Sequence, residues 1–246
     1  MASTVPRVTV FSILNIFLIK DENKDFQPLK FKEFWEQVKV YGAGLNAIGV
    51  KRGDHIGVIS DNRKEWIMSD FGVTGLGAIN VPRGCDSTAD EIQYILAHAD
   101  CPITFAENSA QAEKILSKID QIKLLKKIIL FDPAGMDKLK SPEGVELLSY
   151  DQVYKLGEEA YAKNPDFFDE EVSKGNCDDI ATIIYTSGTT GDPKGVVSKN
   201  SRLAPFGMLA KGVFQYNEED KLYTGLSLTH GNAQAVTLFP ALGTGV

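Results

Sequence analysis

Cysteine and histidine are both scarce in this 246-residue chain, which contains three of each. The cysteines, Cys85, Cys101 and Cys177, stand far apart, so no two of them have the spacing of a metal-binding or redox motif. Isolated thiols are typical of reducing compartments. We therefore expect reduced cysteines in a cytoplasmic protein and no metal site.

The chain also lacks an excess of positive charge and a long apolar run. Its formal net charge is −7, which argues against a nucleic-acid partner. The most apolar N-terminal run, Val8 to Ile19, is interrupted by Ser12 and Asn15 and is too short to span a bilayer. It lacks a basic n-region and a clean small-residue cleavage site, so a signal peptide is not expected. Peripheral contact with a membrane and the oligomeric state stay open.

Short apolar segments alternate with segments of helical periodicity, which indicates a layered α/β fold. The short segments are nearly all apolar, as parallel strands buried on both faces are. The sequence predicts mostly parallel, doubly wound sheets with flanking helices. The expected strands are His55–Ser60, Ala78–Pro82, Pro102–Ala106, Lys127–Phe131, Ile180–Tyr185 and Leu222–Ser227; the expected helices are Phe31–Ile48, Asn62–Leu76, Thr88–Ala99, Ser109–Ile119, Ser149–Ala162, Arg202–Phe214 and Asn232–Leu242.

Local signals set the expected ends of these helices. Asn62 and Thr88 are each followed three residues later by glutamate, which is the pattern of a capping box. Gly49 follows the first long helical stripe as its C-terminal cap. A short amphipathic helix is expected from about Thr9, and Lys138 to Glu146 reads as a polar loop.

A change of composition suggests internal boundaries. Residues 1–30 form a leading segment, and residues 31–165 form a first α/β subdomain. The acidic stretch 166–179 is predicted to be a solvated linker. Residues 180–246 are predicted to begin a second α/β subdomain.

The most informative stretch of the chain is Tyr185-Thr-Ser-Gly-Thr-Thr-Gly-Asp-Pro-Lys-Gly-Val-Val197. Its glycines allow a tightly curled backbone that exposes N–H groups. Hydroxyl groups and the ammonium of Lys194 add further donors. Such donors after a strand suit a polyphosphate. The spacing differs from that of a Walker loop, and Lys194 is followed by glycine instead of a hydroxyl residue.

This stretch resembles, letter for letter, the signature loop of the adenylate-forming (AMP-binding) enzymes. Similarity extends over most of residues 30–246. The stretches Val81–Thr88 and Asn164–Asp166, the latter upstream of Asp178–Ile184, are most similar to long-chain fatty-acid–CoA ligases. The resemblance implies the incomplete N-terminal domain of an acyl-CoA synthetase-like fold.

The resemblance also implies a reaction and its participants. A fatty or other carboxylic acid attacks the α-phosphorus of ATP, pyrophosphate leaves, and CoA then forms the thioester; ATP, Mg²⁺ and CoA are the implied cofactors. Lys194 and His230 would serve as catalytic residues. The residues implied to bind ATP are Thr186, Ser187, Gly188, Thr189, Thr190, Gly191 and Lys194.

Some positions depart from the family pattern. Ser198-Lys-Asn200 replaces a hydroxyl residue followed by histidine, and Thr229 precedes His230 where the family has an apolar or aromatic residue. The segments that hold adenine, ribose and magnesium and the C-terminal domain are not found. We therefore expect the N-terminal portion of a ligase, inactive alone. Two alternatives stay open: an adenylation enzyme that loads a carrier-protein thiol, and a non-catalytic nucleotide-binding fragment.

Overall fold

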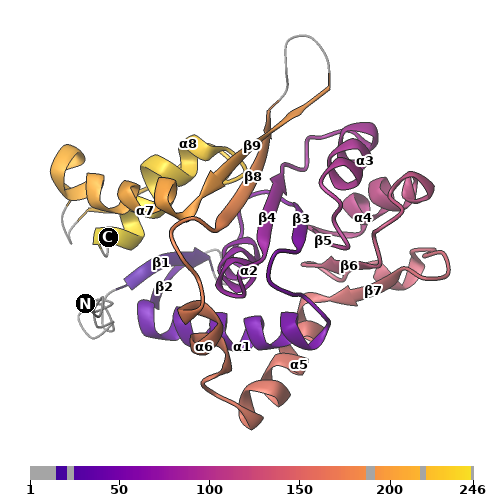
Figure 1. Ribbon diagram of the computed structural model, residues 1–246, viewed down its shortest axis with the longest axis horizontal. Helices are drawn as coiled ribbons and strands as arrows, with labels where there is room; N and C mark the ends of the chain where they lie inside the picture. Colours follow the sequence, from indigo (N-terminus) through magenta and orange to yellow (C-terminus); the bar gives the residue numbers. More distant parts are fainter. Residues whose placement is uncertain (1–14, 21–24, 187–191, 217–219, 245–246) are drawn as a thin grey trace.

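A seven-stranded sheet forms the centre of the protein in the computed structural model, which describes residues 15–20, 25–186, 192–216 and 220–244 (Figure 1). The strand order is β7-β6-β5-β3-β4-β8-β9. The strands are β3 (His55–Ile59), β4 (Ile79–Arg83), β5 (Ile103–Ala106), β6 (Lys127–Leu130), β7 (Glu146–Ser149), β8 (Ile180–Thr186) and β9 (Lys194–Lys199).

The sheet is parallel except at one edge. From β7 to β8 every neighbouring pair is parallel, whereas β8 and β9 pair antiparallel. The chain begins the sheet at β3, places β4 on one side and then places β5 on the other. This reversal creates a topological switch point at the carboxyl end of β3. The predicted doubly wound, mostly parallel α/β fold is confirmed.

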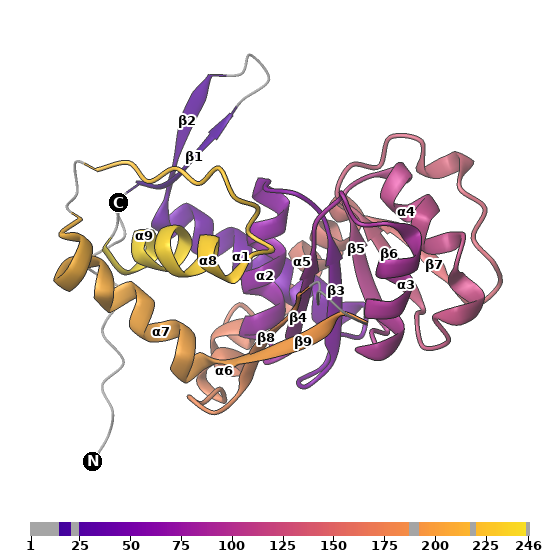
Figure 2. The same ribbon diagram turned by 90° about the horizontal axis from the view of Figure 1, so that it is seen from above.

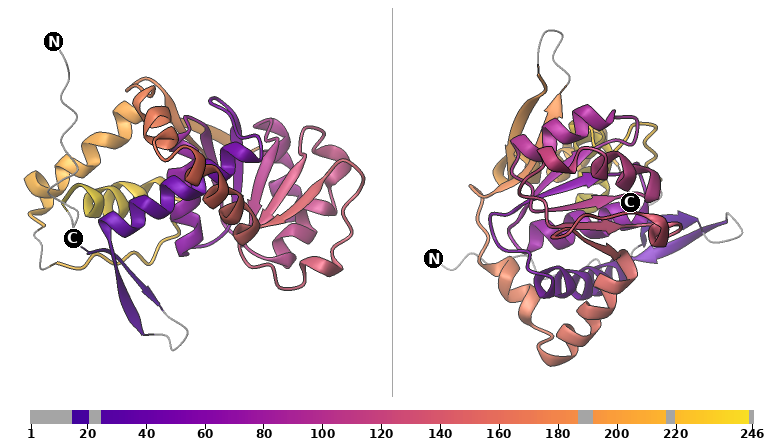
Figure 3. Two further views of the ribbon diagram at one scale, coloured as in Figure 1. Left: turned by 90° about the horizontal axis from the view of Figure 1, so that it is seen from below. Right: turned by 90° about the vertical axis from the view of Figure 1, so that its right-hand side faces the viewer.

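Helices cover both faces of the sheet (Figure 3). Helices α1 (Phe31–Ala47), α2 (Lys64–Gly75) and α5 (Tyr150–Lys163) pack on one face, and α3 (Ala89–His98) and α4 (Ser109–Leu116) pack on the other. Strand β6 shows why both faces are apolar: Ile129 joins the first core cluster, whereas Ile128 and Leu130 join the second. Alternate side chains of a strand point to opposite faces, so a strand covered twice needs apolar residues throughout.

Helices α1 and α5 approach each other closely because each has a glycine at the crossing. A Cβ atom on Gly44 would lie 2.2 Å from the carbonyl oxygen of Val153, and one on Gly157 would lie 2.1 Å from that of Val40. No larger residue fits at either position without separating the backbones. These two helices anchor the lower layer in Figure 1.

The acidic stretch 166–179 is not only a linker, because it contains helix α6 (Phe167–Ser173). Phe168 of this helix is 1% exposed and lies against α1 and α2. The acidic side chains of the stretch hold Arg52 through Glu171 and Asp179. The acidic residues predicted the solvated side of this segment, but they gave no indication that Phe168 is buried. The division into subdomains stays a prediction, while β8 and β9 extend the same sheet as β3 to β7.

One expectation near the N-terminus needs correction, and one strand of the central sheet was not predicted. A short helix was expected from about Thr9. Residues 15–20 instead form strand β1 (Asn15–Lys20), which pairs with β2 (Phe26–Lys30) in a hairpin that projects from the body of the protein (Figure 2). Thr9 itself lies outside the described residues. The polar loop expected at Lys138 to Glu146 is present over residues 139–145, and Glu146 begins the edge strand β7, which pairs with β6 and carries an ion pair between Lys127 and Glu146. Short 3₁₀ turns occupy Ile119–Gln121 and Met136–Lys138.

After β9 the described residues form helices joined by an irregular stretch, and one prediction there is wrong. The helix around Pro205 is confirmed as α7 (Asn200–Leu209), which continues as a π-helix, Ala210–Phe214. The last helical run consists of α8 (Gly231–Ala233), a π-helical segment (Gln234–Leu238) and α9 (Phe239–Thr244). Leu222–Ser227 is not a strand: Tyr223 and Leu226 are exposed, and in the described parts no strand pairs with this segment. No helix in the described ranges is long and apolar enough to cross a membrane.

Candidate active site

The predicted phosphate-binding stretch connects β8 to β9 at the carboxyl end of β8 (Figure 1). In the register of this pair Thr186 lies opposite Lys194, and Tyr185 lies opposite Gly195. Thr186 and Lys194 are both exposed. Among the described residues no carboxylate forms an ion pair with Lys194. The remaining predicted ATP-binding residues lie outside the described residues: Ser187, Gly188, Thr189, Thr190 and Gly191.

Tyr185 fixes the base of this hairpin. Its side chain is 4% exposed, and its hydroxyl oxygen lies 2.7 Å from Nδ1 of His98 at the end of α3. Burial raises the pKa of Tyr185 to about 12, so the phenol keeps its proton at neutral pH and can donate to the imidazole. A Cβ atom on Gly195 would lie 3.2 Å from Cζ of the tyrosine, so this glycine lets β9 cross the ring closely.

Arg83, the last residue of β4, connects the same hairpin to the start of α3. Its Nη1 donates to the carbonyl oxygen of Tyr185 at 3.3 Å, and its Nε donates to Oγ of Ser87 at 2.7 Å. Nη2 lies 3.3 Å from Glu91, whose other oxygen accepts from the backbone N–H of Thr88. The capping box predicted at Thr88 and Glu91 is thus confirmed, and it also orients an arginine toward β8.

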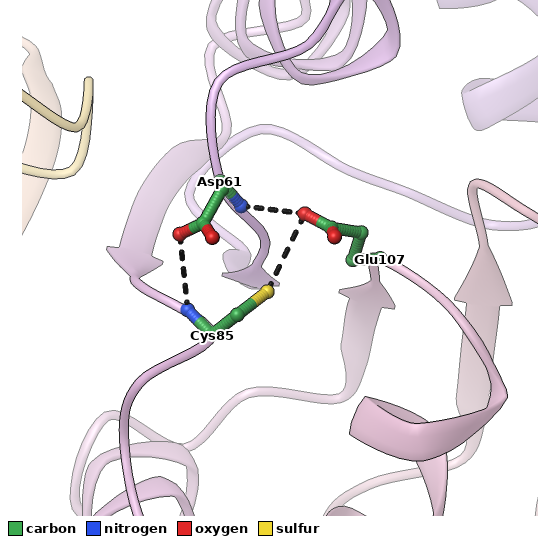
Figure 4. A group of neighbouring side chains, drawn as sticks. All are labelled: Asp61, Cys85 and Glu107. Carbon is green, nitrogen blue, oxygen red and sulfur yellow. Dashed lines mark hydrogen bonds between the residues drawn. The ribbon is translucent and has the colours of Figure 1, made fainter. Parts of the chain in front are cut away.

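A second polar group lies at the switch point, where β3, β4 and β5 end (Figure 4). Glu107 accepts from the backbone N–H of Asp61 at 2.8 Å and from the thiol of Cys85 at 3.4 Å, and Asp61 accepts from the backbone N–H of Cys85 at 3.3 Å. Burial, with the two carboxylates, raises the pKa of the Cys85 thiol to about 12. The thiol is therefore neutral, and the contacts make this group a junction between three strand ends.

The sequence contains a signal for this junction in the positions of the three residues relative to the predicted strands. Each of the three side chains follows directly or closely on a predicted parallel strand, and the carboxyl ends of such strands share one edge. No short motif joins residues 61, 85 and 107, so spacing alone could not find it. Their potential ligand atoms lie within 4.8 Å of one another, yet both carboxylates already accept backbone N–H donors.

His230 lies in the turn that immediately precedes α8 (Gly231–Ala233). It is exposed, and its carbonyl oxygen accepts from the N–H groups of Ala233 and Gln234. A Cβ atom on the next residue, Gly231, would contact Ile184 of β8 at 3.5 Å. The fold therefore brings the start of α8 against the strand that leads into the phosphate-binding stretch.

The turn that precedes His230 is bound by a residue with a different predicted role. Asn62 was expected to cap α2 with Glu65, but α2 begins after Arg63 and has no side-chain cap. Glu65 instead binds Nε of Arg63 at 2.7 Å. The amide of Asn62 donates to the carbonyl oxygen of Leu226 at 2.9 Å and accepts from the N–H of Leu228 at 2.6 Å. The side chain of Asn62 therefore binds the distant residues Leu226 and Leu228 and does not cap α2.

The comparison with known families agrees with this geometry. A model described as AMP-binding enzyme matches residues 12–246. The chain belongs to the AMP-binding enzyme family. The resemblance read from the signature loop is confirmed, and members of this family form adenylates.

Individual members of the AMP-binding family support the same assignment. Fatty acyl-CoA synthetase A of Dictyostelium discoideum is 31% identical over 182 residues, which cover 73% of this chain and 26% of that protein. A chloroplastic long-chain-fatty-acid–[acyl-carrier-protein] ligase of Arabidopsis thaliana is 30% identical over 181 residues, covering 72% of this chain and 25% of that protein. The chain thus spans about a quarter of the length of these curated relatives.

A solved member of the family confirms the fold. The anthranilate CoA ligase AuaEII, solved in complex with anthranoyl-AMP, superposes with a TM-score of 0.73 at 22% sequence identity. The match covers 89% of this chain and 39% of that one. The predicted architecture, that of an adenylate-forming N-terminal domain, is therefore present here.

Proposed function

We propose that this chain carries the polyphosphate-binding side of an ATP-dependent fatty acid–CoA ligase. In the proposed reaction the carboxylate attacks the α-phosphorus of ATP, pyrophosphate leaves, and the acyl adenylate then reacts with CoA. The observation that carries the proposal is the hairpin of β8 and β9, which sets Thr186 and Lys194 opposite each other at the ends of the signature loop. The pairing of the two strands holds the residues at the two ends of the loop at neighbouring positions of the sheet.

The chemistry of the loop residues suits the departure of pyrophosphate. Negative charge builds on the bridging and terminal oxygens as this group leaves, and preorganised donors stabilise that charge most effectively. The ammonium of Lys194 would supply a compact point charge, and the hydroxyl groups of Thr186, Ser187, Thr189 and Thr190 would supply neutral donors. His230 would line the carboxylate side. ATP brings Mg²⁺ with it, and we assign no residue of this chain as a metal ligand.

The identity of the acceptor thiol separates two candidate functions. Relatives include both a fatty acyl-CoA synthetase and a ligase that acts on acyl-carrier protein, so a carrier-protein thiol remains the alternative to CoA. In either case the acid is activated in the same way, because adenylation precedes thiol attack. We favour CoA because of the similarity to long-chain fatty-acid–CoA ligases. A cytoplasmic location remains a prediction.

A binding experiment on the purified chain tests the phosphate-binding role. ATP and inorganic pyrophosphate are titrated separately by calorimetry into the wild type, Lys194→Gln and Lys199→Gln. Lys199 is the matched control, because it lies on the same strand, is exposed and pairs with Asp178 at 3.0 Å. Loss of the ammonium at residue 194 is expected to weaken both ligands about tenfold, since charge-assisted contacts to phosphate are the strong ones.

One result would count against the proposal. Equal affinity of the wild type and Lys194→Gln for pyrophosphate would remove Lys194 from the site. Sustained ATP–pyrophosphate exchange by this chain alone would support the proposal and would contradict only the expectation that the chain is inactive by itself. Lys199→Gln is expected to change the affinity for ATP or pyrophosphate less than about twofold, because the ammonium of Lys199 is exposed and salt screens its charge.

A further inference from the structure

The structure assigns to Asn62 a role as the positioning residue for His230, an inference that rests on the proposed function of that histidine. Asn62 follows β3, the central strand of the sheet at the switch point, whereas His230 lies far along the chain. The contact joining these two regions is a side-chain amide that binds backbone on both of its polar atoms. No short-range pattern in the sequence connects them.

The two hydrogen bonds of Asn62 define the orientation of its amide. Nδ2 donates to the carbonyl oxygen of Leu226 at 2.9 Å, and Oδ1 accepts from the N–H of Leu228 at 2.6 Å. A flipped amide would place donor against donor and acceptor against acceptor, so only one orientation satisfies both partners. The side chain thereby acts as a short piece of backbone that pairs with residues 226–228.

The turn held by Asn62 continues directly into His230. The N–H of His230 donates to the carbonyl oxygen of Ser227 at 3.0 Å, which closes the turn. On its other side the turn is held by Gln234, whose Nε2 donates to the carbonyl oxygen of Leu228 at 2.8 Å. Leu228 is therefore bound at its N–H by Asn62 and at its carbonyl by Gln234, two residues before the histidine.

The exposure of these residues explains why a polar contact is required. Leu228 is buried in the main core cluster, and Gln234 and Thr229 are buried as well, whereas His230 and Asn62 are exposed. Apolar burial fixes how deeply the turn sits but is not directional. Hydrogen bonds to both polar groups of the backbone fix the direction in which the turn presents its next residue. Under the proposed function, this direction sets where the imidazole meets the carboxylate.

The test reads His230 directly in the full chain. Because the chain contains three histidines, the ¹H–¹³C correlations of the imidazoles are few, and His230→Gln assigns the relevant signal. Asn62→Ala removes both hydrogen bonds, and Asn62→Asp keeps the acceptor for Leu228 but loses the donor for Leu226. Asn108→Ala is the matched control, because this residue also follows a parallel strand but its side chain caps α4 by accepting from the N–H of Gln111.

We expect Asn62→Ala to shift the His230 signal and to speed amide hydrogen exchange at Leu228 about tenfold, while the His55 and His98 signals stay unchanged. Asn62→Asp should give a smaller change of both. Asn108→Ala should lower the unfolding temperature without moving the His230 signal. The inference is overturned if Asn62→Ala leaves the signal and the exchange rate at their wild-type values, or if Asn108→Ala shifts the His230 signal equally.

A ligand titration separates this inference from the proposed function. Octanoate is added to the wild type and to Asn62→Ala while the His230 signal is followed. If His230 faces the acid, octanoate shifts the wild-type signal and binds the variant about threefold more weakly. A wild-type signal that ignores octanoate would argue against the acid-side role of His230, whereas the exchange and signal changes without ligand would still support its positioning by Asn62.

Discussion

Replacement of Asp70 by asparagine is expected to change how the stability of this protein depends on pH. Asp70 lies on α2 and accepts a 2.5 Å hydrogen bond from Nδ2 of Asn80 on β4. Burial raises the pKa of its carboxyl group from 3.8 to about 6, and the hydrogen bond from Asn80 partly opposes that rise. Oδ1 of Asn80 is buried, with no partner among the described residues.

The direction of the effect follows from proton binding. Between about pH 4 and pH 6 the folded protein holds a proton on Asp70 that the unfolded chain has released, so this group's contribution to stability falls as pH rises through that window. A shift of roughly two pH units corresponds to about 3 kcal/mol. The carboxyl group is buried although residue 70 as a whole keeps some exposure, so we expect about 2 kcal/mol of this to be realised.

The assay compares free energies of unfolding by guanidinium denaturation at several pH values between 4 and 8. We expect the stability difference between Asp70→Asn and the wild type to move in favour of the variant by about 2 kcal/mol across this range, since an amide has no charge to desolvate. Asp120→Asn, at an exposed residue, is the control. Asn80→Ala should move the transition to higher pH, because it removes the hydrogen bond that stabilises the carboxylate.

One outcome would refute this reasoning. If the difference between Asp70→Asn and the wild type were constant from pH 4 to pH 8, the carboxyl group would titrate alike in the folded and unfolded states. Burial next to Asn80 would then have no electrostatic consequence. The variant must be compared with the wild type at each pH, because other carboxylates also change the stability with pH. The hydrogen bonds of Glu91 to Thr88 lower its pKa, so its contribution to stability rises with pH in both proteins and cancels in the difference.

Two packing predictions concern stability alone. Phe168→Ala should lower the free energy of unfolding by about 3–5 kcal/mol, measured by guanidinium denaturation, because it empties a fully buried aromatic site, whereas Val172→Ala on the same helix, 39% exposed, should cost less than about 1 kcal/mol. Gly44→Ala should lower the free energy of unfolding by about 1–3 kcal/mol in the same measurement, because its Cβ would lie 2.2 Å from a carbonyl oxygen of α5. Gly212→Ala is the control, because a Cβ atom there meets nothing within 4 Å. Equal losses of stability in the two variants would contradict the close crossing of α1 and α5.

The parts of the fold that were predictable are those with local causes. A helical stripe predicted the helix that begins at Phe31, short apolar runs and further stripes predicted the alternation from residue 55 to 131, and the capping box at Thr88 formed as its spacing indicated. Helix α6 escaped prediction because Phe168 is a single buried aromatic residue in an acidic stretch. Strand β7 escaped because it is short and forms by pairing with β6.

The same distinction applies to the candidate site. The signature loop is contiguous in sequence, so the residue types and their spacing identify it. Asn62 was misread because its local capping role and its actual partner, 164 residues away, are equally compatible with the residue type. Arg83 and His98 reach Tyr185 from β4 and α3, and only the parallel pairing of β4 with β8 brings them there.

That pairing also has a consequence for how the protein forms. Asn80 of β4 pairs with Thr182 of β8, about a hundred residues later, whereas β3 through β7 connect through much shorter segments. We expect contacts of such long sequence separation to form late in folding, so that the hairpin carrying the signature loop joins strands that have already paired. Without β8, strand β4 would be an open edge of the sheet, and an open edge can pair with another chain. We therefore expect the phosphate-binding hairpin also to protect this edge from aggregation.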